Sequence, residues 1–225
     1  MHTAHNTAYK NINTELNVCI DSDDFMPPTA IASIYSNWQK VKNNPGIAGL
    51  VGLDESINGE LLGSKFKKTN TEITLSEFYN KQGGTGDKKL VLRTELTKAY
   101  PSYPEFPNER LVPLGTLYTL IERDYKFYAV NEVWAIVDYQ PDGSSANIIT
   151  QYFKSPKGFK YCREINIEYG ITPKIKIKNA IHYNVCLMIL KEPKSFFNNK
   201  YFFLTIPALP FSVLLYFYLL YKNNK

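Results

Sequence analysis

The chain has 225 residues, of which 44% are hydrophobic and 21% are charged, and its mean hydropathy is −0.28. This composition is that of a water-soluble globular protein and excludes a polytopic membrane protein. The three cysteines, Cys19, Cys162 and Cys186, are an odd number without a Cys-x-x-Cys pair. We therefore expect reduced thiols, and neither a disulfide framework nor a structural zinc site.

The formal net charge of +5 is divided unevenly along the chain. Residues 174–225 hold eight lysines and one acid, Glu192, for a net +7, whereas residues 1–173 hold 18 Lys and Arg against 20 Asp and Glu, for −2. A nucleic-acid-binding protein more often carries its cations on the folded domain, so we expect no nucleic-acid partner. Lysines beside an apolar segment are typical of a chain that meets anionic lipid. The alternative is a lysine-coated edge strand, because Lys174, Lys176 and Lys178 alternate with isoleucines.

The N-terminal segment has no basic stretch followed by an apolar one, so it does not have the pattern of a secretory signal. We accordingly expect the bulk of the chain to be cytoplasmic. His2 and His5 lie in a terminus that we expect to be mobile. His182 lies in an apolar run, and we interpret it as a core or interface residue rather than a catalytic one.

Three carboxylates follow the first apolar run of the chain, residues 16–20: Asp21, Asp23 and Asp24. A strand that ends in D-x-D presents carboxylates to Mg²⁺ or Mn²⁺ in some sugar and phosphoryl transferases. The residues that would complete a dehalogenase-like motif or an EF-hand are missing. We interpret the three as a solvated acidic turn that caps the next helix, and we expect no metal site and no cofactor.

The first half of the chain predicts alternating helices and strands. Apolar spacing predicts a helix over 30–42 and strand-and-turn structure over 46–63, and a strand followed by a helical turn near Phe78. The glycine-rich stretch 83–89 lacks the P-loop pattern and predicts a flexible hairpin connection. A strand over 90–96, an extended proline-rich segment over 99–110 and a helix over 114–123 follow.

The second half predicts a series of strands. Alternation over 126–139, the turn 141–143 and a returning run over 146–153 indicate a hairpin, and residues 163–169, 174–178 and 180–190 indicate three more strands. The predicted fold class is α+β, an antiparallel β-sheet with two or three helices packed on one face. We expect one soluble domain over 1–195, joined to a basic linker and membrane segment over 196–225.

The C-terminal run from Tyr201 to Tyr221 carries no charge over 21 residues. As a helix it is about 30 Å long, the thickness of a bilayer core, and its terminal tyrosines suit the two interfaces. Pro207 and Pro210 interrupt the helical hydrogen-bond ladder. We predict a single-pass, tail-anchored membrane segment with the domain on the cytoplasmic side. The alternative is a buried terminal helix or hairpin in a soluble cytoplasmic protein.

Four short motifs occur in the order LDESI (53–57), LVLRTEL (90–96), VPLGTL (112–117) and IITQYF (148–153). This order resembles the chorismate pyruvate-lyase family, which has an antiparallel sheet with helices. The resemblance implies that Arg93 holds a substrate carboxylate and that Leu114 lines the cavity. Gln151 stands where the family has a carboxylate, which puts the catalytic role of that position in doubt.

Two functions remain open on the sequence. The first is a noncatalytic binding or scaffolding module, held at a membrane by its tail, whose partners are lipid and a protein. The second is an enzyme acting on a small organic acid, with Arg93, Leu114 and Gln151 as ligand-binding residues. A cavity at Arg93 favours the second function, and an exposed apolar patch favours the first.

Overall fold

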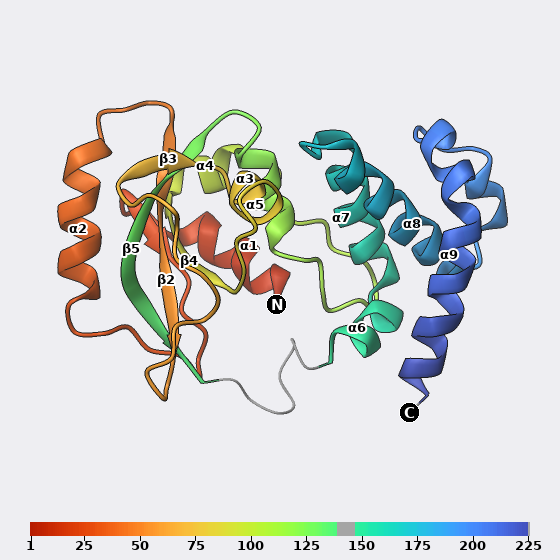
Figure 1. Cartoon of the computed structure of the whole chain (residues 1–225), viewed down its shortest axis with the longest axis horizontal. Helices are drawn as coiled ribbons and strands as arrows, with labels where there is room; N and C mark the ends of the chain where they lie inside the picture. The colour runs from red at the N-terminus through yellow and green to blue at the C-terminus, as the bar shows by residue number, and fades with distance from the viewer. Residues whose placement is uncertain (139–146, 225) are drawn as a thin grey trace. The chain divides into compact units, whose positions relative to one another are not determined.

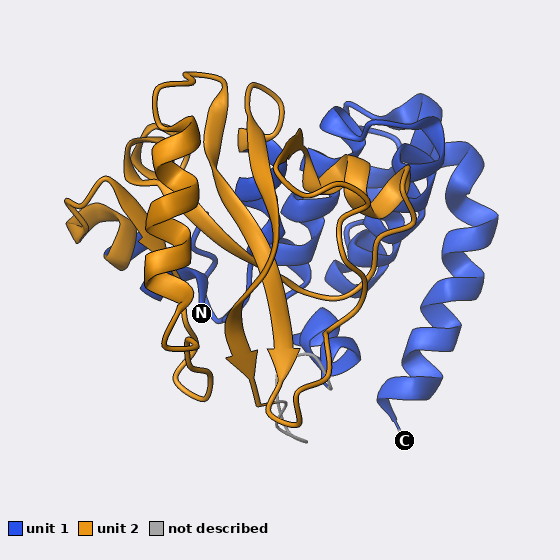
Figure 2. Cartoon of the chain, turned by 60° about the vertical axis from the view of Figure 1, so that its left-hand side comes forward, with its two compact units in different colours: residues 1–7, 102–120, 141–225 blue, residues 8–101, 121–140 orange. Residues whose placement is uncertain are grey.

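The computed structural model describes residues 1–138 and 147–224. The chain forms two compact units (Figure 2). Unit 1 comprises residues 1–7, 102–120 and 141–225, and unit 2 comprises residues 8–101 and 121–140. The sheet belongs to unit 2, and the helices of the second half of the chain belong to unit 1.

The sheet of unit 2 is mixed rather than antiparallel throughout. Its strands, in the order β1-β4-β2-β5-β3, are β1 (Leu16–Val18), β4 (Lys88–Arg93), β2 (Ile47–Ser56), β5 (Lys126–Val137) and β3 (Thr71–Ile73). The pairing of β2 with β5 is parallel, and the other three pairings are antiparallel. The long connection between β2 and β5 permits the parallel pairing, because it returns the chain to the end of the sheet where β2 began.

Both faces of the sheet are covered, so the prediction of helices on one face is wrong. The helix α2 (Ala30–Val41), predicted over 30–42, packs on one face through Ala30, Ile34 and Trp38. The short helix α3 (Leu75–Asn80) lies on the other side of the strands (Figure 1). The first eight residues of β2 are consequently buried, which is the pattern of a central strand with two covered faces.

Trp134 on β5 lies at the centre of the core beneath α2. Its side chain is fully buried next to Trp38, and its indole Nε1 donates to Ser33 Oγ at 2.8 Å. A Cβ at Gly52 would lie 2.3 Å from the Trp134 ring. Glycine at this position of β2 therefore makes the space that the indole fills.

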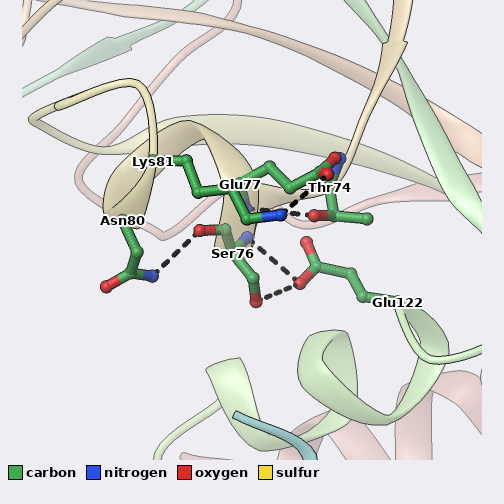
Figure 3. A network of polar contacts seen from close by, with 6 residues as sticks. All are labelled: Thr74, Ser76, Glu77, Asn80, Lys81 and Glu122. Carbon is green, nitrogen blue, oxygen red and sulfur yellow. Dashed lines mark hydrogen bonds and ion pairs between the residues drawn. The ribbon is translucent and has the colours of Figure 1, made fainter. Parts of the chain in front are cut away.

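The helix α3 is fixed at its N-terminus by side-chain hydrogen bonds (Figure 3). Thr74 and Glu77 form a capping box. The Glu122 carboxylate accepts hydrogen bonds from the Leu75 and Ser76 amides, and from the Ser76 hydroxyl at 2.7 Å. These acceptors satisfy amides that a helix N-terminus leaves without partners.

Other predictions for the first half need small changes. The strand predicted over 90–96 ends at Arg93, where α4 (Thr94–Ala99) begins, and the second predicted helix is α5 (Gly115–Ile121). The N-terminus is the helix α1 (His2–Asn11) rather than a mobile segment. His2 is buried in it, and its Nδ1 accepts a hydrogen bond from the Val112 amide at 3.0 Å.

The strands predicted after residue 146 are wrong, because this part of the chain is helical. It forms α6 (Ile148–Lys154), α7 (Pro156–Tyr169), α8 (Pro173–Leu190) and the short 3-10 helix η1 (Pro193–Phe196). A proline begins both α7 and α8, and Thr172 Oγ1 caps α8 by accepting from the Ile175 amide. The predicted turn 141–143 lies outside the described residues.

The C-terminal apolar run is the helix α9 (Phe202–Asn223), which contains Pro207 and Pro210. Among the described residues it is the one helix long and apolar enough to cross a membrane. Along its length it packs against the other helices of unit 1. Leu204 and Ala208 join a cluster with Tyr183 and Leu187, and Leu219 joins a cluster with buried residues of α6, α7 and α8.

Replacement of Trp134 tests the assignment of the core. We expect Trp134→Ala to lower the free energy of unfolding by about 3 to 5 kcal/mol, because it removes a fully buried indole and leaves a cavity under α2. Urea denaturation measures the change. The control is Tyr35→Ala on α2, a side chain that is 65% exposed. It should change the free energy of unfolding by about 0.5 kcal/mol or less. An unchanged midpoint for Trp134→Ala would remove β5 from the core.

Candidate ligand site at the carboxyl edge of the sheet

Three strands of unit 2 run in the same direction and end at the same edge of the sheet. β1 and β2 are both antiparallel to β4, and β2 is parallel to β5, so β1, β2 and β5 share one orientation. Ligands of sheets with helices on both faces bind beyond the carboxyl ends of such strands. The side chains that follow β1, β2 and β5 therefore mark a candidate ligand site.

The acidic turn follows β1 and crosses to the end of β5. Phe25 and Ile136 exchange backbone hydrogen bonds at 3.1 and 2.8 Å. Asp24 Oδ1 accepts a hydrogen bond from the Asp138 amide at 3.3 Å. The Asp24 carboxylate thus ties the turn to the sheet, and it does not cap α2, whose N-cap Thr29 makes no side-chain cap bond. Asp21 and Asp23 remain exposed.

Asp54 lies near the end of β2, and its carboxyl group is buried. Its side chain is 2% exposed, and Oδ1 has no hydrogen-bond partner among the described residues. Burial raises the pKa of Asp54 to about 6, an increase that Lys89 opposes and Asp87 reinforces. Burial also raises the pKa of Asp24, and the Asp138 amide and Lys89 oppose that shift. A buried carboxyl group without a partner is expensive in stability and is common at functional sites.

Two lysines at the start of β4 supply positive charge at the same edge. Lys88 Nζ donates to the carbonyls of Thr85 and Asp87 at 3.0 and 2.9 Å, so it fixes the glycine-rich loop 83–89. Gly86 is in close contact with the backbone of Gly63, with a φ of +73° that favours glycine. The loop connects α3 to β4 and is not a hairpin turn. Lys89 Nζ lies 3.5 Å from the Cys19 carbonyl oxygen.

The charged side chains at this edge suit a polar ligand rich in hydroxyl groups. Exposed carboxylates accept hydrogen bonds from hydroxyl groups, and a lysine ammonium attracts phosphate oxygens. Within the described residues, no three His, Cys, Asp or Glu side chains are grouped closely enough to hold a metal ion. The carboxylates therefore do not form a metal-binding cluster in this structure.

Arg93, the predicted carboxylate clamp, lies at the opposite end of β4. Its Nε donates to the Ile47 carbonyl at 2.7 Å, and its Nη2 donates to the Lys42 carbonyl at 2.7 Å. The guanidinium carbon lies 4.5 Å from the centre of the Trp38 ring. These contacts join the end of α2 to the start of β2.

The other sequence-predicted residues lie in unit 1. The Leu114 carbonyl, at the start of α5, accepts from Tyr103 Oη at 2.8 Å, and Gln151 lies in the middle of α6. Leu114 and Gln151 thus belong to a different unit from Arg93. His182 on α8 is partly buried, with Nδ1 3.2 Å from Tyr152 Oη, and burial lowers the pKa of His182 to about 4.

Sequence reasoning passed over Asp54 and Asp138 as site residues. Asp54 lies near the end of the apolar strand β2 and Asp138 directly follows β5, as the acidic turn follows β1, and this repeated position was the available signal. It gains meaning only when the three strands are known to be parallel. None of the three cysteines, all within the described residues, forms a disulfide.

No family model matches the chain, and no curated protein matches its sequence. Solved structures do resemble it. S. aureus TarS has a TM-score of 0.52 at 15% sequence identity, over 86% of this chain and 32% of TarS. A TarS 1-349 structure in complex with UDP-GlcNAc has a TM-score of 0.51 at 14% identity, over 92% of this chain and 59% of that one. The chain thus spans a third to three fifths of the TarS chains, and the likeness is one of fold.

The pKa of Asp54 predicts a pH-dependent stability. In the folded state the Asp54 carboxyl group stays protonated up to about pH 6. Its ionisation therefore lowers the free energy of unfolding by up to about 3 kcal/mol as the pH rises from 4 to 8. We expect Asp54→Asn to be more stable than the wild type at pH 8 and similar to it at pH 4. Urea denaturation at both values measures this, and an equal difference at the two pH values contradicts it.

The contacts of Arg93 predict a loss of stability on mutation. Arg93→Ala and Arg93→Lys should each lower the unfolding free energy by about 2 to 3 kcal/mol, because neither side chain reproduces the fork that binds two carbonyls. Thermal denaturation measures the loss. If Arg93 instead clamps a substrate carboxylate, Arg93→Ala abolishes small-acid binding and leaves the stability unchanged.

Proposed function

We propose that unit 2 binds a nucleoside diphosphate sugar at the carboxyl edge of its sheet. The observation that carries the proposal is the convergence at this edge of the acidic turn, which is tied to β5 through Asp24 and Asp138, with the orphaned carboxyl group of Asp54. The solved structure with a similar fold that was crystallised with UDP-GlcNAc supports this ligand class.

The proposed roles follow from the charges at the site. The exposed carboxylates of Asp21 and Asp23 accept hydrogen bonds from ribose or sugar hydroxyl groups, as acidic residues do at the carboxyl edge of nucleotide-binding sheets. Lys89 attracts the diphosphate. The buried Oδ1 of Asp54 has no partner among the described residues, and a ligand hydroxyl that reached it would provide one.

Isothermal titration of the full chain with UDP-GlcNAc tests this proposal. We expect binding, and we expect Asp21→Asn combined with Asp23→Asn to weaken it roughly tenfold or more, since each carboxylate hydrogen bond contributes about 1.5 to 3 kcal/mol. Glu95→Gln, an exposed acid that follows the opposite end of β4, is the matched control and should bind like the wild type. Titrations with Mg²⁺ and with EDTA report whether a cation takes part. Absence of binding in both buffers would refute the proposal.

A second proposed function, favoured by a separate observation, is attachment to a membrane through α9. The helix is long and apolar enough to enter a bilayer, and only 22% of its most apolar stretch is buried in the fold. The proposed role is then a domain held at a lipid surface, with the bulk of the chain in the cytoplasm. Flotation of the purified chain with lipid vesicles tests attachment.

A further inference from the structure

The two sides of α9 have the reverse of the usual polarity. Its buried residues within unit 1 are mainly small or polar: Thr205, Ala208, Ser212 and Leu219. Its exposed residues are large and apolar, with Phe203, Phe211, Leu214 and Phe217 each between 62% and 91% exposed. A helix on a water-facing surface presents its polar side to water. The outer side of α9 is therefore suited to an apolar environment.

The inner side of α9 is held by a buried polar contact. Asn184 on α8 is fully buried, and its Nδ2 donates to the Thr205 carbonyl at 2.7 Å and to Ser212 Oγ at 3.1 Å. Ser212 Oγ in turn donates to the Ala208 carbonyl at 2.8 Å. If α9 left unit 1, the Asn184 amide would lose both of these acceptors.

A spanning arrangement conflicts with this packing. Both ends of α9 contact the other helices of unit 1, Leu204 through one buried cluster and Leu219 through another. If α9 crossed a bilayer with these contacts intact, α7 and α8 would enter the hydrocarbon with it. A charged side chain at the centre of a membrane helix is strongly unfavourable. The charged residues on those two helices are Lys157, Lys160, Arg163, Glu164, Glu168, Lys174, Lys176 and Lys178.

The charge of unit 1 indicates the kind of surface that covers α9. By sequence, unit 1 holds 13 Lys and Arg against 6 Asp and Glu, a net +7, whereas unit 2 holds 13 against 15, a net −2. Lys191, Lys194, Lys200 and Lys222 are exposed on the segments that lead into and end α9. Each lysine near an anionic membrane contributes about 1 kcal/mol of attraction.

From these observations we infer that α9 lies in the plane of an anionic membrane surface, with its outer apolar side in the interface, and does not cross the bilayer. The inference rests on the proposed membrane attachment and specifies its mode. An interfacial helix needs one strongly apolar side and flanking cations, and it keeps its contacts with the folded unit. Unit 1 as it is folded meets these conditions without loss of the Asn184 contacts.

Vesicle binding of the full chain, purified without detergent, tests both levels of the proposal. We expect flotation with vesicles of phosphatidylcholine and phosphatidylserine, and severalfold weaker binding to phosphatidylcholine alone or in 0.5 M NaCl. Phe211→Glu and Phe217→Glu should each weaken binding roughly tenfold or more, since each removes a phenyl ring that the membrane interface buries, worth about 1.5 to 3 kcal/mol. Ile31→Glu and Tyr35→Glu, exposed apolar residues of α2, are the matched controls and should bind normally.

Depth measurements separate the interfacial from the spanning mode. Single replacements Phe203→Trp, Phe211→Trp and Phe217→Trp are compared in vesicles with shallow or deep brominated acyl chains, against the constant signal of the buried Trp38 and Trp134. We expect all three to be quenched alike, and mainly by shallow bromines. If deep bromines quench Phe211→Trp most strongly while shallow bromines quench Phe203→Trp and Phe217→Trp, the inference is overturned but attachment to the membrane stands.

Two further outcomes are informative. Absence of flotation with either vesicle refutes the attachment itself, and with it the inference. If the chain does not float but is a dimer in sedimentation, and Phe211→Glu makes it a monomer, then a second copy covers the outer side of α9 and the inference is wrong.

Discussion

The parallel pairing of β2 with β5 is the constraint on which the organisation of unit 2 depends. It places the carboxyl ends of both strands at one edge, and the antiparallel β4 between β1 and β2 orients β1 the same way. Asp24, Asp54 and Asp138 reach one edge for this reason, although more than 100 residues separate the first from the last. The pairing also requires both faces of β2 to be covered, because a parallel strand with an open face is rarely stable in water.

Two charged groups of unit 2, the partly buried Arg93 and the buried Asp54, have opposite environments. Arg93 is surrounded by acceptors, since its Nε and Nη2 donate to main-chain carbonyls and its guanidinium lies over the Trp38 ring. Asp54 has an oxygen without a partner, and burial raises its pKa. A charge that the fold satisfies stabilises the fold, whereas a charge that the fold leaves unsatisfied is available to a ligand. This difference is the reason to place the candidate site at the Asp54 edge.

Unit 1 has a different organisation, in which polar groups are turned inward and large apolar groups outward on its last helix. In the interior, Asn184 Nδ2 donates to the Thr205 carbonyl and to Ser212 Oγ, so the polarity of α9 has a structural cause on its inner side. Its outer side has no such cause within the described part of unit 1, and a lipid surface would supply one. If α9 binds a membrane as proposed, stability and membrane affinity depend on opposite sides of the same helix.

The sequence by itself determined the local elements whose patterns are unambiguous: the helix α2, the strand β5, the apolar length of α9 and the division of charge between the two parts of the chain. It did not determine the state of residues 147–190, where apolar runs fit a strand as well as a helix and where Lys and Ile alternate over residues 174–178. There the packing of α7, α8 and α9 against one another decided for helices, because Tyr183, Asn184 and Leu187 are buried together only at helical spacing. The surroundings of Arg93 and of the aspartates were likewise decided by tertiary structure, since the partners of a charged group come from distant segments that no local pattern identifies.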